Sequence, residues 1–378
     1  MNPRKIIYVT GTRADYGLIC EVLQRLNVAE DIMLSLCVTG MHLSPLYGHT
    51  IKEIEAAKLI ICGIIPINLD INTQAGMAES IGHEIIGMTE LFARENPDLI
   101  MVLGDRGEML AAAIAAVHLN IPVVHFHGGE RSGTVDEMVR HAISKLSHYH
   151  FVATESSKLR LIKMGEAEHT VTVVGAPGLE EICRYTPCGR GEFNDKHGLN
   201  QTKKNILFIY HPVVQEFNTI KEQFEIVLKA ALATSAQVIC LEPNSDAGGH
   251  LIRDVLQRYK NTGELKIIKH LLRKEYIDCL ANSDVMLGNS SSGIIEAASL
   301  NLPVINVGSR QNLRECSDNI IHVDNSFAAV TNALNNALNQ EKINYINVYG
   351  DGKTSEKCYE LLRTITLEPQ ILNKCNAY

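Results

Sequence analysis

The sequence predicts an α/β protein with two doubly wound parallel-sheet domains. Short apolar runs alternate with amphipathic stretches along almost the whole chain, which is the pattern of repeated strand–helix–strand units. At 378 residues the chain is too long for one compact core and long enough for two. A stretch rich in glycine and proline at residues 175–191 interrupts the pattern, so we expect a first domain over residues 1–177 and a second that begins at residue 178.

Each predicted strand is a short apolar run, and each predicted helix is an amphipathic stretch between two such runs. In the first half, strands are expected at residues 5–10, 33–39, 99–104, 123–126, 150–153 and 171–174, and helices at 77–95, 108–119 and 136–146. In the second half, strands are expected at 205–210, 237–241, 265–269, 285–288 and 303–307, and helices at 219–232, 248–258 and 293–299. Ligands bind beyond the carboxyl ends of the strands in such sheets, so we expect a central cleft lined by the loops that follow strands.

Charge and composition exclude several classes of function. The chain carries 35 basic and 43 acidic residues, a net charge of −8, and no cluster of Lys and Arg, so nucleic acid is not an expected partner. The longest apolar stretch, residues 59–67, is about half of the ~20 residues that a membrane-spanning helix needs. The 10 cysteines are scattered without a C-x-x-C pair, which indicates reduced thiols in a cytoplasmic protein and no zinc framework.

The loop after the first strand, residues 11–17, lacks the G-x-G-x-x-G pattern of dinucleotide sites. A glycine turn before a helix still exposes backbone N–H groups that suit an anion, and Arg13 adds a positive charge. We therefore expect Arg13 to contact a phosphate; the alternative is an ordinary turn with an arginine that faces solvent.

The loop after residues 99–103 carries Asp105 and Arg106. A carboxylate at the carboxyl end of a buried strand can act as an acid or a base, although Asp105 could instead cap the helix that follows. The next loop holds His125, His127 and two glycines, and a helix then places Asp136 and Arg140 on one face. Neither cysteine nor HExxH spacing accompanies these histidines, so a metal is not expected.

The second half has its own polar loops at strand ends. His211 follows one strand, Asn244 and Asp246 lie in a polar turn after another, and Arg310 follows a third. Residues 288–296 combine three serines, Ser290, Ser291 and Ser292, with Gly293 at a helix start and Glu296 one turn later. Amides and hydroxyls in this arrangement suit a diphosphate, and an acidic residue suits ribose hydroxyls. The alternative, simple N-capping by one serine, does not explain three hydroxyls in a row.

Taken in order, these motifs resemble the hydrolysing UDP-N-acetylglucosamine 2-epimerases of the sialic and legionaminic acid branch. The residues that carry the resemblance are 11–16, 104–106, 128–136, 140–141, 211–212 and 289–293. The resemblance implies two Rossmann-like domains of GT-B type, with UDP on residues 178–353, the sugar facing residues 1–177, and a C-terminal helix in residues 354–378 that returns to the first domain. It also implies no cofactor, a cytoplasmic location, and a homodimer or a dimer of dimers.

The same resemblance implies roles for individual residues. Asp105, Asp136 and His127 would be catalytic; many relatives carry a carboxylate where this chain has His127, which is a departure from the pattern. The residues that would contact the substrate are Arg13, His42, Arg106, Glu130, Arg140, His211, Asn244, Asp246, Ser290, Ser291, Ser292, Gly293, Glu296 and Arg310.

The implied reaction converts UDP-N-acetylglucosamine to N-acetylmannosamine plus UDP. Departure of UDP and loss of the C2 proton would give a glycal-like alkene, and rehydration would invert C2. The same reaction on UDP-N,N'-diacetylbacillosamine is an alternative, because the two sugars differ only at C4 and C6. Three other functions remain as alternatives: a non-hydrolysing 2-epimerase, a GT-B glycosyltransferase and an inactive nucleotide-sugar sensor. Incubation with the donor sugar alone would distinguish them.

Overall fold

The computed structural model describes residues 3–45, 48–67, 74–131, 135–243, 248–269, 271–341 and 343–378. The backbone contacts divide the chain into two compact units, the first formed by Met1–Glu181 with Tyr349–Tyr378 and the second by Ile182–Val348. Each unit contains one sheet, and the strand pairings within both sheets are parallel. The predicted α/β class with two parallel sheets is therefore confirmed.

The first sheet has seven strands in the order β3-β2-β1-β4-β5-β6-β7. Their bounds are Ile61–Ile65 (β3), Ile32–Thr39 (β2), Arg4–Thr10 (β1), Leu99–Leu103 (β4), Val123–Phe126 (β5), Tyr149–Val152 (β6) and Val171–Val173 (β7). The strand order reverses between β1 and β4, and ligands in such folds bind at this reversal.

The second sheet has six strands in the order β10-β9-β8-β11-β12-β13. Their bounds are Leu265–Ile268 (β10), Gln237–Leu241 (β9), Asn205–Ile209 (β8), Val285–Gly288 (β11), Val304–Val307 (β12) and Ile320–Val323 (β13). Here the strand order reverses between β8 and β11, so the loops after these two strands lie where ligands bind in such sheets.

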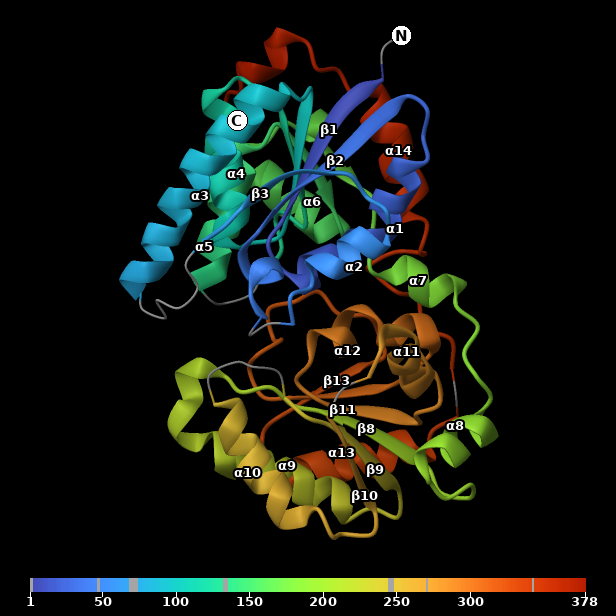
Figure 1. Ribbon diagram of the computed structural model, residues 1–378. Coiled ribbons are helices and arrows are strands. Elements are labelled where there is room, and N and C mark those ends of the chain that lie inside the picture. The colour runs from blue at the N-terminus through green and yellow to red at the C-terminus, as the bar shows by residue number, and fades with distance from the viewer. Residues whose placement is uncertain are drawn as a thin grey trace. The chain divides into compact units, whose positions relative to one another are not determined.

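Helices cover both faces of each sheet (Figure 1). In the first unit they are α1 (Arg13–Asn27), α2 (Ile51–Ala56), α3 (Gln74–Glu95), α4 (Gly107–His118), α5 (Val135–Leu146), α6 (Glu155–Lys163) and α14 (Thr354–Thr364), and α7 (Leu179–Arg184) crosses the boundary between units. In the second unit they are α8 (Arg190–His197), α9 (Ile220–Leu232), α10 (Gly249–Tyr259), α11 (Arg273–Ala281), α12 (Ser291–Ile295) and α13 (Phe327–Asn339).

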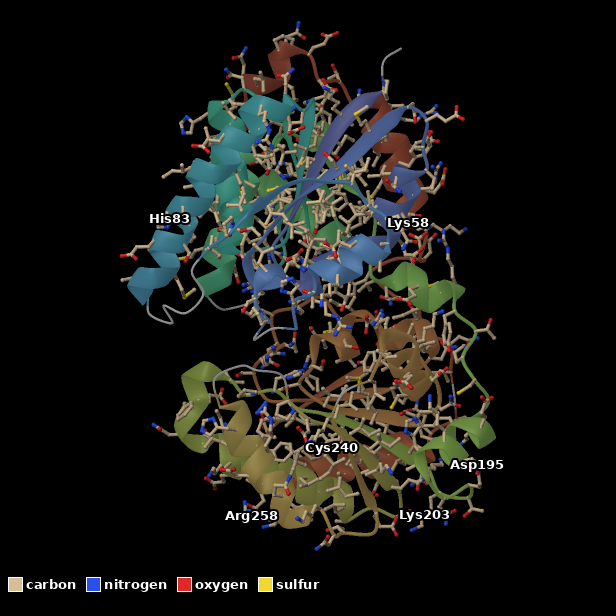
Figure 2. The ribbon with its side chains drawn as sticks, viewed as in Figure 1. Lys58, His83, Asp195, Lys203, Cys240 and Arg258 are labelled. Atoms are coloured by element: carbon tan, nitrogen blue, oxygen red, sulfur yellow. The ribbon has the colours of Figure 1, made fainter. Side chains whose placement is uncertain are left out.

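Each sheet packs two apolar layers, one on each face. In the first unit one layer includes α1 and α14, which lie side by side, and the other includes α3 and α4. In the second unit one layer includes α9, α10 and α13, and the other includes α8 and α11. Cys240 of β9 lies within the second unit, whereas Asp195, Lys203 and Arg258 lie at its periphery (Figure 2).

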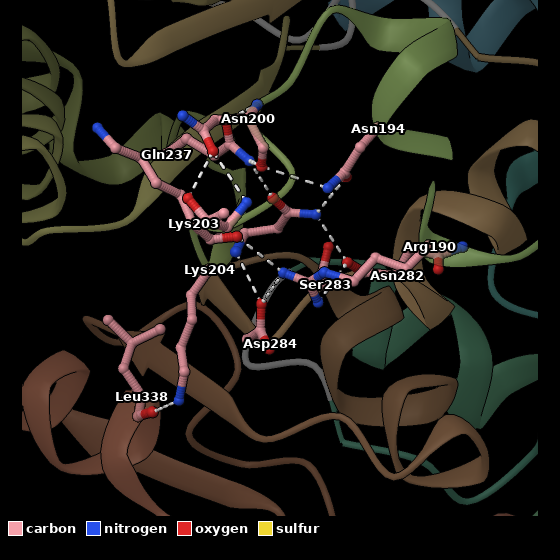
Figure 3. A network of polar contacts seen from close by, with 12 residues as sticks. Arg190, Asn194, Asn200, Lys203, Lys204, Gln237, Asn282, Ser283, Asp284 and Leu338 are labelled. Carbon is pink, nitrogen blue, oxygen red and sulfur yellow. Dashed lines mark hydrogen bonds and ion pairs between the residues drawn. The ribbon is translucent and has the colours of Figure 1, made fainter. Parts of the chain in front are cut away.

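A buried polar network closes the amino ends of the strands in the second sheet (Figure 3). Gln237 Nε2 donates to Asn205 Oδ1 at 2.7 Å, and the Asn205 backbone N–H donates to Asp284 Oδ2 at 2.7 Å. Arg190 Nη2 donates to the same carboxylate oxygen at 2.7 Å. Because these residues bond one another at the edge opposite the polar loops, we assign them a structural role.

All eleven predicted strands are present, and two further strands, β3 and β13, were not predicted. The predicted helix at residues 293–299 is instead the short α12 followed by a 3₁₀ turn at Ala297–Leu300. Across the described ranges, none of the helices combines the length and the apolar character that a bilayer-crossing segment requires.

Candidate active site

The turn between β1 and α1 is stabilised by the chain's own carboxylate, Asp15. Thr12 caps α1, and Asp15 Oδ2 accepts hydrogen bonds from the amides of Gly11 at 3.2 Å and Thr12 at 2.7 Å. Burial raises the pKa of Asp15 to about 6, although hydrogen bonds from Thr10 and Thr12 act in the opposite direction. These two backbone amides therefore already donate to Asp15, and the predicted phosphate contact of Arg13 at this turn stays a prediction.

Two other residues predicted from the first unit have partners within it. Arg13 is half-exposed, and its Nε lies 3.0 Å from Glu53 Oε1 on α2. His42 is fully buried; its Nε2 lies 2.9 Å from the Thr10 hydroxyl and its Nδ1 lies 2.8 Å from the Thr50 hydroxyl. Burial lowers the pKa of His42 to about 4. With both ring nitrogens engaged, His42 supports the turn after β2, and the geometry offers no ring nitrogen to a substrate.

Arg106 pairs with a buried carboxylate that sequence reasoning missed, Glu108. The Arg106 Nε lies 3.2 Å from both carboxylate oxygens of Glu108, and Nη2 lies 3.1 Å from Oε1. A Cβ atom on Gly11 would lie 2.8 Å from Glu108 Cγ, so the glycine makes room for this side chain. Burial raises the pKa of Glu84, on α3, to about 8, and the nearby negative charge of Glu108 is the second cause of this rise.

Asp105 pairs with Arg140, another arginine predicted for the site. Arg140 Nη2 donates to Asp105 Oδ2, and the Arg140 side chain is only 4% exposed. The Nε and Nη1 atoms of Arg140 are buried and have no hydrogen-bond partner in the described part of the chain. Buried donors are nearly always satisfied, so these two atoms are suited to donate to an acceptor such as a ligand oxygen.

His125 positions the loop that carries Asp105. Its Nε2 donates to the carbonyl of Gly104 at 2.8 Å, and its Nδ1 lies 3.0 Å from the Ser144 hydroxyl on α5. Burial lowers the pKa of His125 to about 3, so it stays neutral. His125 thus joins β5, the Gly104 turn and α5, and this link is structural.

His127 has a strained backbone and a free ring nitrogen. Its φ angle is +61°, a left-handed conformation that non-glycine residues rarely adopt. Its Nδ1 bonds Glu130 Oε1, both residues are buried, and its Nε2 is buried with no partner among the described residues. Because the carboxylate accepts the Nδ1 proton, Nε2 is left to exchange a proton or to bind a ligand. Glu130 therefore supports His127 in this geometry.

Asp136 lies in the first turn of α5, four residues before Arg140. Its side chain falls outside what the structure describes, as do residues 132–134, Asn244 and Asp246. The predicted roles of Asp136, Asn244 and Asp246 stay predictions.

In the second unit, Asn289 joins the loops that follow β8 and β11. Its Oδ1 accepts from the His211 amide at 2.7 Å, and its Nδ2 donates to the His211 carbonyl at 2.8 Å. Arg310 Nη1 donates to the Asn289 carbonyl at 3.0 Å. Gly288 has φ +131°, and a Cβ there would lie 1.9 Å from the Ile209 carbonyl oxygen. The structure thus brings His211 and Arg310 to the loop that begins the serine run.

The serine run has unequal members. Ser290 caps α12, and its Oγ accepts from the Ser292 amide at 3.4 Å. Ser292 Oγ instead donates to Glu296 Oε2, while Arg273 lies 2.8 Å from Glu296 Oε1. A Cβ on Gly293 would lie 3.0 Å from Val304 Cγ1, so this glycine permits close packing of α12 on the sheet. Arg273 was not predicted, because nothing near it in the sequence resembles a site motif.

Comparison with known proteins agrees with the resemblance. Residues 24–363 match the UDP-N-acetylglucosamine 2-epimerase family model. The chain is 68% identical over 375 residues, 99% of this chain and 100% of the other, to a Legionella pneumophila protein named UDP-N,N'-diacetylbacillosamine 2-epimerase (hydrolyzing). It is 33% identical over 352 residues, 93% of this chain and 92% of the other, to the UDP-N-acetylglucosamine 2-epimerase of Neisseria meningitidis serogroup B.

Solved structures agree on the fold. The crystal structure of the UDP-GlcNAc 2-epimerase of Neisseria meningitidis bound to UDP-GlcNAc has a TM-score of 0.78, with 20% identity over 95% of this chain and 99% of that one. At this identity the likeness concerns the GT-B-like fold alone. Together with the family model and the Legionella relative, it leads to one conclusion: the chain belongs to the UDP-N-acetylglucosamine 2-epimerase family and is a hydrolysing 2-epimerase.

Proposed function

We propose that the chain converts UDP-N,N'-diacetylbacillosamine and water to UDP and the free 2,4-diacetamido sugar with C2 inverted. The observation that carries this substrate is the 68% identity, over nearly the full length of both chains, to the Legionella pneumophila protein of that name. The motifs alone placed UDP-N-acetylglucosamine first, and this identity reverses the order.

In this proposal the second unit holds the nucleotide. Ser290, Ser291, His211 and the Arg310 cation contact the diphosphate, and Asn244 and Asp246, which follow β9 in sequence, contact the nucleotide. Arg13 of the first unit contacts the same group. Cations and hydroxyl donors fixed around the diphosphate stabilise the negative charge that grows on it as the C1–O bond breaks.

The first unit carries the proton transfers. Loss of UDP leaves an oxocarbenium-like C1, which acidifies the neighbouring C2–H. One group takes the C2 proton to give the alkene; water then adds at C1, and a second group gives a proton to C2 from the opposite face. We assign these steps to Asp105, Asp136 and His127. The Asp105–Arg140 pair and the buried His127–Glu130 pair support this assignment, because each fixes a titratable group beside polar atoms that have no partner among the described residues.

Turnover of both UDP-sugars in heavy water, followed by NMR, tests the proposal. The expected products are UDP and the free inverted sugar with deuterium at C2. The kcat/KM for UDP-N,N'-diacetylbacillosamine should exceed that for UDP-N-acetylglucosamine by about tenfold or more. Product that stays attached to UDP would indicate a non-hydrolysing epimerase. Absence of UDP release without an acceptor would indicate a transferase, and binding without turnover would indicate a sensor.

UDP-N-acetylglucosamine is the second candidate substrate. The family model that matches residues 24–363 and the 33%-identical Neisseria meningitidis relative both carry that name. A higher kcat/KM for this sugar in the same assay would favour it, with N-acetylmannosamine as the product.

A further inference from the structure

Three side chains and Glu296 form a continuous polar chain in the second unit. Tyr276 of α11 contacts the Ser292 hydroxyl, and Ser292 Oγ contacts Glu296 Oε2. On the other side, Arg273 Nη2 lies 2.8 Å from Glu296 Oε1. Glu296 itself is buried. The helix that carries Arg273 and Tyr276, α11, contained no residue that was predicted for the site.

The direction of each proton in this chain follows from what each group can donate. A carboxylate paired with arginine only accepts, so the single Ser292 proton points to Glu296. Ser292 must then accept from Tyr276. Burial raises the pKa of Tyr276 above its ordinary range, so the phenol keeps the proton that it donates.

This direction of the hydrogen bonds gives Ser292 a different role from Ser290 and Ser291. Phosphate oxygens are acceptors, and Ser292 has no second proton to give them. Glu296, in contrast, has about four lone-pair sites, of which two face Arg273 and Ser292. The remaining sites suit hydroxyl donors. The chain therefore ends on a carboxylate that is fixed from both sides and can still accept hydrogen bonds from a sugar.

We propose that Tyr276 and Arg273 are positioning residues of the nucleotide site, and that Ser292 works with them to hold Glu296 for the ribose hydroxyls and does not bind phosphate. This inference rests on the proposed function, because it requires UDP on the second unit with its ribose at Glu296. It corrects the sequence-based expectation that all three serines cradle the diphosphate.

Calorimetric titration with UDP, 2′-deoxy-UDP and 3′-deoxy-UDP tests the proposal without any turnover. The wild-type chain is expected to bind UDP about tenfold or more tightly than at least one deoxynucleotide, as for a hydrogen bond to a charged group. Tyr276→Phe and Ser292→Ala are expected to weaken UDP binding and to leave the affinity for that deoxynucleotide nearly unchanged. Discrimination against the missing hydroxyl should thus fall several-fold.

Tyr185→Phe is the matched control. The Tyr185 hydroxyl donates to Asp278 Oδ2 at 3.2 Å, so it too bonds a residue of α11, but it lies outside the chain at Glu296. This variant should keep the wild-type discrimination. Arg273→Lys, which keeps a cation beside Glu296, should retain more of the discrimination than Arg273→Met.

Two outcomes would overturn the inference. If Tyr276→Phe and Ser292→Ala weaken UDP and both deoxynucleotides by the same factor, these residues act on the phosphates or on folding. If the wild-type chain binds UDP but does not distinguish it from either deoxynucleotide, Glu296 does not contact the ribose. A wild-type chain that fails to bind UDP at all would instead reject the proposed function, and this inference with it.

Discussion

At the scale of single residues, the first unit separates two ion pairs that lie next to each other in sequence. Asp105 pairs with Arg140, whereas Arg106 pairs with Glu108. Glu108 therefore engages Arg106, whereas Arg140 donates directly to Asp105. Since Arg140 also has two buried donors that find no partner among the described residues, a substrate oxygen near Asp105 would complete its hydrogen bonds.

Replacing Asp105 by Asn should lower turnover by about 10²-fold or more, the scale expected when acid–base help is lost. UDP affinity should stay near that of the wild type, because the residues proposed for UDP lie mainly in the second unit. Steady-state kinetics and UDP titration measure the two effects. Unchanged turnover would remove Asp105 from the proton transfers.

Glu130→Gln tests the pairing with His127. The amide keeps the shape but gives Nδ1 a weaker, neutral partner, so the orientation and basicity of Nε2 should change. We expect kcat to fall by about tenfold or more with little change in KM, together with a shifted pH–rate profile. Glu137→Gln is the control, because Glu137 also lies near a histidine, His141 at 3.6 Å, but outside the proposed proton transfers. An equal effect of both changes would assign Glu130 a purely structural role.

At the scale of secondary-structure elements, the sequence predicted the strands that are buried on both faces. The eleven predicted strands include every interior strand of both sheets, where side chains are apolar on both faces. The two strands that were missed, β3 and β13, both lie at sheet edges and are partly exposed, so they lack the full burial of the interior strands. The helix after the serine run was predicted too long, because its continuation as a 3₁₀ turn depends on tertiary packing.

The same limit applies to the site. Residue types at strand ends predicted which loops are polar, but not which side chains pair across the fold. Asp15 lies in a predicted motif, yet its occupation of the Gly11 and Thr12 amides appears only in three dimensions. Glu108 and Arg273 meet their partners through contacts that spacing alone does not indicate.

Gly288→Ala should be among the most destabilising single substitutions in the second unit. The residue has φ +131°, and a methyl group would lie 1.9 Å from the Ile209 carbonyl oxygen of the neighbouring strand. We expect a loss of about 3 kcal/mol or more in the free energy of unfolding, or failure to fold. Urea unfolding of Gly191→Ala is the control, because its Cβ within α8 meets no atom within 4 Å and should be neutral or stabilising. Equal stability of the two variants would contradict the strain argument.

At the scale of the whole molecule, the chain leaves the first unit, forms the second and then returns. On its return, Ser355 bonds the buried Glu180 carboxylate, and α14 packs on α1. Farther on, Lys374 Nζ donates to backbone carbonyls at the end of α5, including that of Ser147 at 2.6 Å, and pairs with Glu166 at 2.6 Å. The C-terminal segment thus helps to fix the helix that carries Asp136 and Arg140.

Buried titratable groups in the first unit should give its stability a maximum near pH 6.5. Burial lowers the pKa of His42 and of His148 to about 4 and that of His125 to about 3, from 6.5. Below pH 6.5 these histidines bind protons in the unfolded chain but stay neutral in the folded chain. The free energy of unfolding therefore falls as the pH falls toward 4. Burial has the opposite effect on carboxyls: it raises the pKa of Asp15 to about 6 and that of Glu84 to about 8.

Above pH 6.5 the unfolded chain has released the proton that folded Glu84 still holds. Stability therefore declines as the pH rises toward 8, by about 2 kcal/mol for 1.5 pH units. Between pH 4.5 and 6 three histidines outweigh the two carboxyls, so stability still rises with pH there. Urea unfolding at pH 5.5, 6.5 and 8 measures both slopes. Glu84→Gln should abolish the alkaline slope, whereas Glu79→Gln, an exposed position on the same helix, should leave it unchanged. An alkaline slope that persists without the Glu84 carboxyl would assign it to another group.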